Sequence, residues 1–160
     1  MPGETPWQTV GPFFSLGLGA GSRGALASPG RAGAIEIAGV VRDGAGEPVP
    51  DALLELWQPE GWARAATAPD GSFAFLTVKP ARGATGAAEA PHLTVSVFAR
   101  GLMRRLVTRI YFPDEPEANA RDPFLRGLED PGGLLARPDG DALRFDVVLQ
   151  GEGETVFVDA

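Results

Sequence analysis

The chain has very few side chains that can bind a transition metal or act as a nucleophile. Its 160 residues include one histidine, His92, one tyrosine, Tyr111, and no cysteine. Without cysteine, disulfides, thiolate ligands and a cysteine nucleophile are excluded. One histidine and one tyrosine are a poor ligand set for zinc or iron. From residue types alone, His92 is more readily a hydrogen-bonded structural histidine than a catalytic or ligand residue.

Other catalytic motifs are incomplete. The acidic run GEGE at 151–154 lacks the spacing of a calcium loop and is typical of a turn between strands. The glycine-rich segment 17–24 has no Walker lysine, because the only lysine is Lys79. Ser96 has no Gly-x-Ser-x-Gly context, so a hydrolase would depend on His92 alone. We therefore expect no catalytic residue and no metal site within this chain.

The net charge of −7 argues against general nucleic-acid binding. Four arginines nevertheless fall within ten residues, namely Arg100, Arg104, Arg105 and Arg109. They indicate either an ion-paired strand edge or a site for an anionic small molecule or an acidic partner. The sequence shows no signal peptide and no apolar run long enough to span a membrane, so we expect a cytoplasmic protein without membrane contact.

Alternating apolar residues predict the elements that would position these side chains. Strand patterns occur in residues 35–43, 52–58, 72–79, 92–98, 105–112 and on both sides of 151–154, with glycine- and proline-rich turns between them. Residues 112–133 have room for one or two short helical turns. The pattern predicts an all-β antiparallel sandwich of about seven to eight strands.

The first 34 residues differ from the rest of the chain. They contain eight glycines and four prolines and show neither a strand nor a helix period. Their aromatic residues, Trp7, Phe13 and Phe14, are costly to leave in water. We expect residues 1–34 to form an irregular arm that docks on a partner subunit, and residues 35–160 to form the β-sandwich domain.

Several stretches, in order from Thr5 to the C-terminus, resemble the intradiol ring-cleaving dioxygenases, and within them the α subunits. They are TPWQTVGPFFSLGL, GVVRDGAGEPVPDALLELWQPEG, DGSFAFLTVKP, APHLTVSVFARG, RIYFPDEPEANARDP and LRFDVVLQGEGETVFVDA. The resemblance implies an α/β hetero-oligomer of homologous sandwich subunits in aromatic catabolism. Non-haem Fe(III) would be held by two tyrosines and two histidines of the β subunit. With O₂, the enzyme would cleave the catechol 3,4-dihydroxybenzoate to 3-carboxy-cis,cis-muconate.

The resemblance also assigns positions in this chain. The His-x-His ligand pair of the iron-binding subunit corresponds to His92 and Thr94, so these are vestigial ligand positions, and the insert after the Trp-Gln strand is shortened. Thr9, Gly11, Pro12 and Phe13 match a stretch that lines the partner's pocket. Arg100 matches an arginine near the substrate, where a guanidinium would favour a carboxylated catechol.

The function expected from the resemblance is therefore a non-iron-binding subunit that completes its partner's pocket. Two alternatives remain open from the sequence. One is a non-enzymatic binding or structural module with the same sandwich fold. The other is an independent hydrolase that uses His92.

Overall fold

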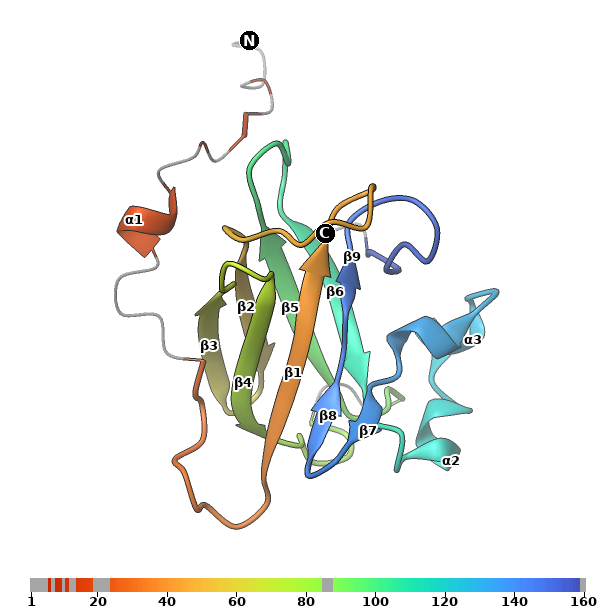
Figure 1. Cartoon of the computed structure of the whole chain (residues 1–160). Helices are drawn as coiled ribbons and strands as arrows, with labels where there is room; N and C mark the ends of the chain where they lie inside the picture. The colour runs from red at the N-terminus through yellow and green to blue at the C-terminus, as the bar shows by residue number, and fades with distance from the viewer. Residues whose placement is uncertain are drawn as a thin grey trace, which may run out of the picture.

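Two β-sheets pack face to face in a sandwich (Figure 1). The structure is a computed structural model of the whole chain, and it describes residues 6, 8–9, 11, 14–18, 24–84 and 88–158. The expected all-β sandwich is confirmed.

The first sheet is built around the long strand β1 (Ala34–Arg42). Strand β4 (Ser72–Val78) pairs with β1 in antiparallel fashion over seven residue pairs. On the other side of β1, β8 (Ala142–Arg144) and β9 (Val147–Val148) pair in parallel, and β7 (Arg137–Asp139) extends the sheet next to β8. This sheet is therefore mixed rather than purely antiparallel.

The second sheet is entirely antiparallel and has the order β3-β2-β5-β6. Its strands are β2 (Leu53–Gln58), β3 (Gly61–Ala66), β5 (His92–Phe98) and β6 (Leu106–Tyr111). Only Pro59 and Glu60 separate β2 from β3, in agreement with the shortened insert expected after the Trp-Gln strand. This sheet carries His92 and Thr94.

The core lies between the two sheets, where alternate residues of each strand point inward. Ile37 and Phe75 from the first sheet and Leu56, Leu93 and Ile110 from the second are all fully buried. Each such side chain contributes roughly 1.5–3 kcal/mol to folding by leaving water. These contacts hold β5, and hence His92, at a fixed place in the sandwich.

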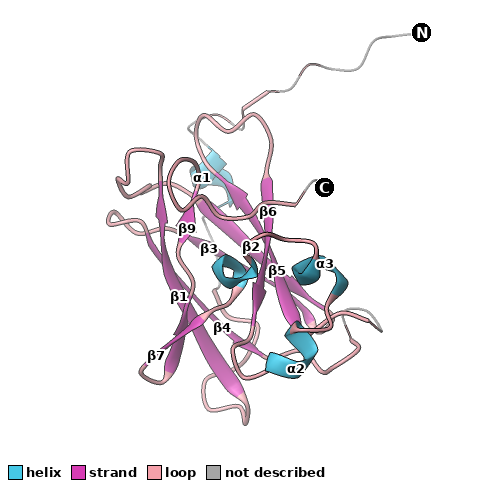
Figure 2. Cartoon of the chain, turned by 90° about the vertical axis from the view of Figure 1, so that its right-hand side faces the viewer, coloured by secondary structure: helices cyan, strands magenta, loops and turns pink. Residues whose placement is uncertain are grey.

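Three short helices follow β6 on one side of the sandwich (Figure 2). They are α2 (Pro116–Asn119), α3 (Pro123–Arg126) and the 3₁₀ helix η1 (Pro131–Leu134). Each begins with proline, which suits the first helical position because its missing N–H would have no partner there. The side chains of Asp122 and Asp130 cap α3 and η1. These are the short turns expected in residues 112–133.

Two strands of the structure are not predicted by the sequence. Strand β3 has alternating burial, but its inward residues are Ala63 and Ala65, which are weak strand formers. Strand β7 is only three residues long and fully exposed, so it has no hydrophobic pattern. The strand expected after 151–154 is reduced to an isolated bridge between Val158 and Val107.

The end of the expected arm bonds to the domain. Leu26 N donates to Leu76 O at 2.9 Å, and Leu76 N donates to Gly24 O at 2.6 Å. Earlier in the arm, helix α1 (Phe14–Leu18) is described, with Leu18 44% exposed. Trp7, Pro12 and Phe13 lie outside the described residues. The docking of residues 1–34 on a partner stays a prediction.

Candidate functional site

His92, which is predicted to be a vestigial ligand position, is buried, with 4% of its surface exposed. Its Nδ1 lies 2.9 Å from Ala90 O, and because a carbonyl only accepts, Nδ1 carries the proton. Burial lowers the pKa of His92 below its ordinary value of 6.5, against the opposing effect of the Ala90 hydrogen bond, and the positive charge of Arg109 lowers it further. His92 is therefore a neutral, hydrogen-bonded side chain at neutral pH, as a structural histidine would be.

Tyr111 lies beside His92 on the neighbouring strand. The two residues are paired across β5 and β6, and their ring centroids are 5.2 Å apart. Arg109 Nη1 donates to the Tyr111 hydroxyl at 3.2 Å. Burial raises the pKa of Tyr111 to about 12, although the Arg109 hydrogen bond acts in the opposite direction. The phenol is neutral at physiological pH and is not poised to become a tyrosinate ligand.

Thr94 projects from the same face of β5 as His92 and is partly exposed. Its cross-strand neighbours are Trp57 on β2 and Arg109 on β6. Trp57 stacks on Trp62 with centroids 5.6 Å apart, and the two residues remain 44% and 49% exposed. The second ligand position thus lies in a row of aromatic, hydroxyl and cationic side chains across the outer face of the sheet.

The donor set for ferric iron does not fit these residues. The expected donor set needs two tyrosines and two histidines, whereas this chain has one of each, and Thr94 occupies the predicted second histidine position. Within the described ranges, no group of three or more histidine, cysteine, aspartate or glutamate side chains is arranged to hold a metal ion. No iron chemistry is therefore assigned to residues of this chain.

Arg100 lies in the turn after β5, at the opposite end of that strand from His92. It forms an ion pair with Asp51, and its side chain remains 58% exposed. Arg100 and Asp51 border a pocket of about 480 Å³, which Pro50, Gly101 and Leu149 also line. The structure keeps Arg100 and His92 apart, so the two residues do not share one small ligand.

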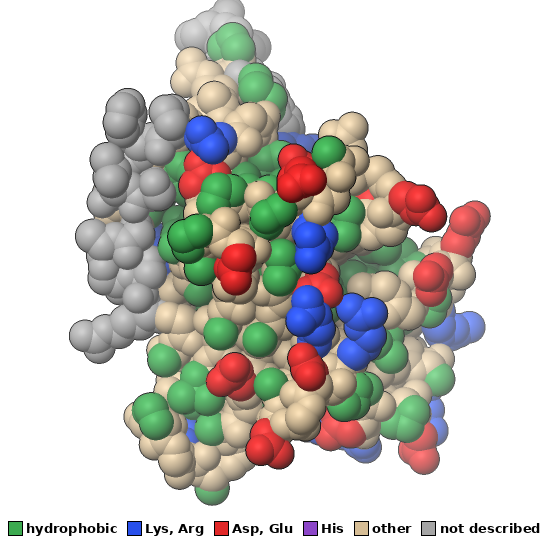
Figure 3. Space-filling model, viewed as in Figure 1, with side chains coloured by type: hydrophobic (Ala, Val, Ile, Leu, Met, Phe, Trp, Pro, Cys, Tyr) green, Lys and Arg blue, Asp and Glu red, His purple; other side chains and the backbone are tan. Residues whose placement is uncertain are grey.

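Arg109, another member of the arginine cluster, is also ion-paired. Arg109 pairs with Glu89 at 3.1 Å and lies 4.8 Å from the centroid of the Phe124 ring. Together with the Arg100–Asp51 pair, this favours the ion-paired interpretation of the cluster. Basic and acidic side chains also intermingle on the face shown in Figure 3. Arg137 and Arg144 both pair with Asp146.

The arm residues are only partly described. Thr9 is exposed, and Gly11 has a φ of 77°, a left-handed conformation that favours glycine. A Cβ at Gly11 would meet no atom within 4 Å, so the space beside its α-carbon is open. Pro12 and Phe13 lie outside the described residues, and the roles of all four residues remain predictions.

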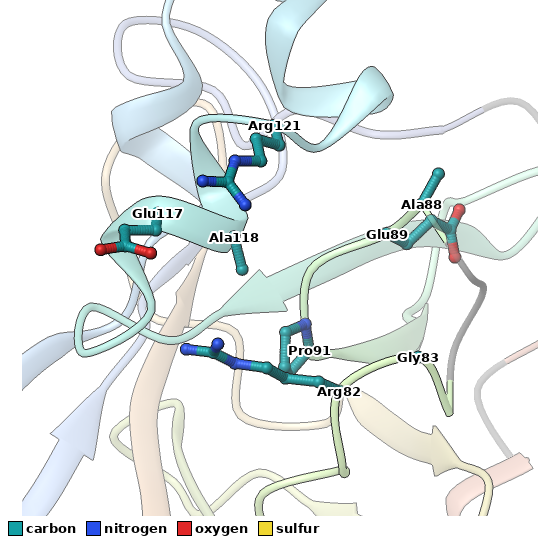
Figure 4. A pocket seen from close by; sticks show the side chains of 8 residues that line it. All are labelled: Arg82, Gly83, Ala88, Glu89, Pro91, Glu117, Ala118 and Arg121. Atoms are coloured by element: carbon teal, nitrogen blue, oxygen red, sulfur yellow. The ribbon is translucent and has the colours of Figure 1, made fainter.

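A pocket near His92 was not expected from the sequence (Figure 4). It has a volume of about 320 Å³ and lies between residues 82–83 and 88–91 on one side and helix α2 with Arg121 on the other. Two arginines, Arg82 and Arg121, and two glutamates, Glu89 and Glu117, line it. The pocket combines segments about 30 residues apart, and no local pattern could have revealed it.

Comparison with known proteins identifies the family. The chain is 39% identical to the protocatechuate 3,4-dioxygenase alpha chain of Pseudomonas putida, with 98% of this chain and 96% of the relative aligned. The alpha chain of Burkholderia cepacia is 38% identical over 98% and 97% of the two chains. The chain belongs to the protocatechuate 3,4-dioxygenase alpha-chain family. No protein-family model matches it.

The chain is also similar to the beta chain of the same enzyme. The protocatechuate 3,4-dioxygenase beta chain of Burkholderia cepacia is 31% identical over 76% of this chain and 66% of that one. Alpha and beta chains are therefore homologous. The alignments with the alpha chains span 193 positions, more than the 160 residues present here, so those relatives carry segments that this chain lacks.

Solved structures confirm the intradiol dioxygenase fold. The dioxygenase domain of a dioxygenase and carbohydrate-binding fusion protein from Streptomyces sp. SirexAA-E is 30% identical, with a TM-score of 0.65 over 92% of this chain and 98% of that one. Hydroxyquinol 1,2-dioxygenase from Pseudomonas putida DLL-E4 shares the fold at 23% identity, with a TM-score of 0.59 over 78% and 57% of the two chains. None of the described helices is long and apolar enough to cross a membrane.

Proposed function

We propose that this chain is the non-iron-binding subunit of a protocatechuate 3,4-dioxygenase. It acts with a homologous β-type chain, which binds the ferric iron, in the O₂-dependent intradiol cleavage of 3,4-dihydroxybenzoate to 3-carboxy-cis,cis-muconate. The observation that carries the proposal is the near full-length identity of 38–39% to two alpha chains of that enzyme.

The side chains at the predicted vestigial ligand positions support the proposal that the β-type chain, and not this chain, binds the iron. His92 is the only histidine, Tyr111 is a buried neutral phenol, and Thr94 has no nitrogen to offer a metal. A chain with these residues cannot reproduce a donor set of two tyrosines and two histidines. The redox centre of the proposed enzyme therefore belongs to its partner.

In this proposal, the chain contributes walls and charge to the partner's pocket. Thr9, Gly11, Pro12 and Phe13 line it from the arm, with the bare backbone of Gly11 free to approach a flat ring. Arg100 is more than half exposed at a turn, and its pairing with Asp51 orients the guanidinium. A guanidinium held in this way can bind the substrate carboxylate through charge-assisted hydrogen bonds.

The test is reconstitution. The chain purified alone should hold no stoichiometric iron and give no turnover of 3,4-dihydroxybenzoate. Co-expression with the β-type chain from the same source should give a coloured ferric complex that forms the ring-opened product. Stoichiometric iron in the isolated chain, or a complex with iron but no turnover, would contradict the proposal. The latter result would favour the alternative of a non-enzymatic binding module.

A further inference from the structure

We propose that a pocket between the first sheet and η1 binds a small ligand that carries a dianionic phosphate group. The volume of this pocket, about 320 Å³, lies within the roughly 300–1,000 Å³ typical of ligand pockets. Three arginines line it, namely Arg42 from β1, Arg137 from β7 and Arg144 from β8. Neither His92 nor Arg100 lines it, so the pocket is separate from the positions that the resemblance assigns.

One carboxylate, that of Asp146, orients two of the three arginines. Arg144 Nε donates to Asp146 Oδ2 at 3.0 Å, and Arg137 Nη2 donates to the same oxygen at 3.3 Å. Asp146 Oδ1 lies 2.9 Å from Arg144 Nη2 and accepts a hydrogen bond from Val40 N at 3.0 Å, which ties the carboxylate to β1. Because a guanidinium has five N–H donors, both arginines keep donors for a ligand.

Arg42 and Thr155 add donors from two other segments. Arg42 is partly buried, and its Nη1 donates to Gly46 O at 3.0 Å. In the part of the chain that the structure describes, no carboxylate pairs with Arg42. Thr155, which also lines the pocket, is 7% exposed, and its hydroxyl accepts from Val148 N at 2.9 Å. Accepting this bond leaves the O–H proton of Thr155 for another acceptor.

The charge and arrangement of these donors favour a phosphate group. The lining contains three guanidinium groups but only two carboxylates, those of Asp146 and the exposed Glu154, in a chain of net charge −7. Figure 3 shows basic side chains gathered over the first sheet. Arginines from three strands and a hydroxyl from a fourth segment suit a tetrahedral phosphate, which accepts hydrogen bonds on several sides, better than a planar carboxylate.

The pocket also has room for a small carbon group attached to the phosphate. A Cβ at Gly133 or Gly153, which both line it, would meet no atom within 4 Å. The apolar side chains of Leu135 and Phe145 belong to the same lining. Inorganic phosphate and a small phosphate monoester present the same dianionic group, and the experiment distinguishes between them.

The experiment is calorimetric titration of the isolated full chain at pH 7.5 in a low-salt buffer without phosphate. We expect saturable binding of inorganic phosphate and of glycerol 3-phosphate. Acetate, which carries one charge on a planar group, should bind at least about tenfold more weakly. Tighter binding of glycerol 3-phosphate would identify the ligand as a monoester, and tighter binding of inorganic phosphate would identify it as the free ion. Acetate binding as tight as phosphate binding, or no saturable binding of either phosphate, would overturn the proposal.

Two variants with opposite expected effects test the location. Arg42→Gln removes the guanidinium that pairs with no described carboxylate and should weaken phosphate binding about tenfold. Glu154→Gln removes a carboxylate from the lining and should tighten phosphate binding about twofold to threefold. Arg105→Gln, at an exposed position outside the pocket, changes the net charge of the chain as Arg42→Gln does and is the matched control, with phosphate binding as in the wild type.

Equal losses of binding in Arg42→Gln and Arg105→Gln would overturn the site, since the attraction would then come from the overall charge. Unchanged binding in Arg42→Gln would also overturn it. Because Glu154 is exposed, its variant should fold even if Arg42→Gln does not, and weaker or unchanged binding in Glu154→Gln would contradict the site as well. The titration needs neither iron nor a partner, so its result is independent of the proposed function.

Discussion

The ring of His92 faces that of Tyr111 across β5 and β6, with centroids 5.2 Å apart, and Arg109 donates to the Tyr111 hydroxyl. The Tyr111 hydroxyl therefore accepts a hydrogen bond within the chain. At the position where the resemblance predicts a metal ligand in the other subunit, this chain has a histidine that packs on Tyr111 and bonds to Ala90.

The first prediction concerns pH. Burial holds the pKa of His92 below 6.5 in the folded chain, whereas the unfolded chain titrates near that value. Below about pH 6.5 the unfolded state binds more protons, so the free energy of unfolding falls as the pH drops. The slope from this one group is at most about 1.4 kcal/mol per pH unit. Urea unfolding at pH 7.5 and 5.5 should show this loss in the wild type.

The matched variant is His92→Phe, which keeps an aromatic ring beside Tyr111 but cannot be protonated. Its free energy of unfolding should change less between the two pH values than that of the wild type. An identical pH dependence in both proteins would show that His92 does not titrate as its burial requires. The same variant tests the hydrolase alternative, because a hydrolase based on His92 would lose all activity.

Asp122 joins the segment before β5 to helix α3. Its fully buried carboxylate accepts hydrogen bonds from the backbone N–H groups of Ala90, Phe124 and Leu125. Asp122→Ala removes the cap of α3 and leaves buried donors unpaired, so we expect a loss of about 3 kcal/mol in the free energy of unfolding. Chemical denaturation of the wild type and the variant measures this loss in the free energy of unfolding. The cap of η1 is exposed, and Asp130→Ala should cost no more than about 1 kcal/mol.

Glu115 holds together two segments that are distant in the sequence. Lys79 and Arg82 both pair with it, and the hydrogen bond from Lys79 is the main cause that lowers the pKa of Glu115 below its ordinary 4.5. The stabilisation is present above about pH 4.5 and is lost as the pH falls below that value. Because Lys79 and Arg82 are partly exposed, Glu115→Gln should cost only about 1 kcal/mol at pH 7. At pH 3.5 the loss of stability caused by Glu115→Gln should be smaller. The control Glu117→Gln, at an exposed position, should change the free energy of unfolding little at either pH.

The sandwich could be predicted because apolar and polar residues alternate clearly in its central strands. Alternation in residues 35–43 and 92–98 corresponds to β1 and β5, whose inward residues Ile37 and Leu93 are fully buried. Strand β3 could not be predicted, because its inward residues are alanines and its pairing is supplied by β2. Hydrophobic alternation finds a strand only where large side chains fill the core.

The features of the candidate sites also differ in whether the sequence alone could predict them. The type and spacing of His92 and Thr94 were visible in the sequence, and β5 places both on one face. The buried Oδ1 of Asn119, which has no partner among the described residues, was not visible, because it depends on how the chain packs after β6. Residue types indicate which chemistry is available, but a buried acceptor without a partner is a property of the packed chain.

The last prediction concerns substrate preference. If Arg100 binds the substrate carboxylate in the assembled enzyme, Arg100→Gln should raise the KM for 3,4-dihydroxybenzoate about tenfold or more, the effect of one lost charge-assisted contact. Turnover of catechol, which has no carboxylate, should change little. Because Arg100 is 58% exposed, the stability of the chain should stay within about 0.5 kcal/mol of the wild type.

Asp51→Asn separates positioning from charge, because it leaves Arg100 in place but removes its ion-pair partner. If the pair orients the guanidinium, this variant should raise the KM for 3,4-dihydroxybenzoate, but less than Arg100→Gln does. A parallel loss of activity on catechol and 3,4-dihydroxybenzoate in Arg100→Gln would argue against carboxylate binding. It would indicate instead that Arg100 serves the contact between subunits, because a defect in assembly affects both substrates equally.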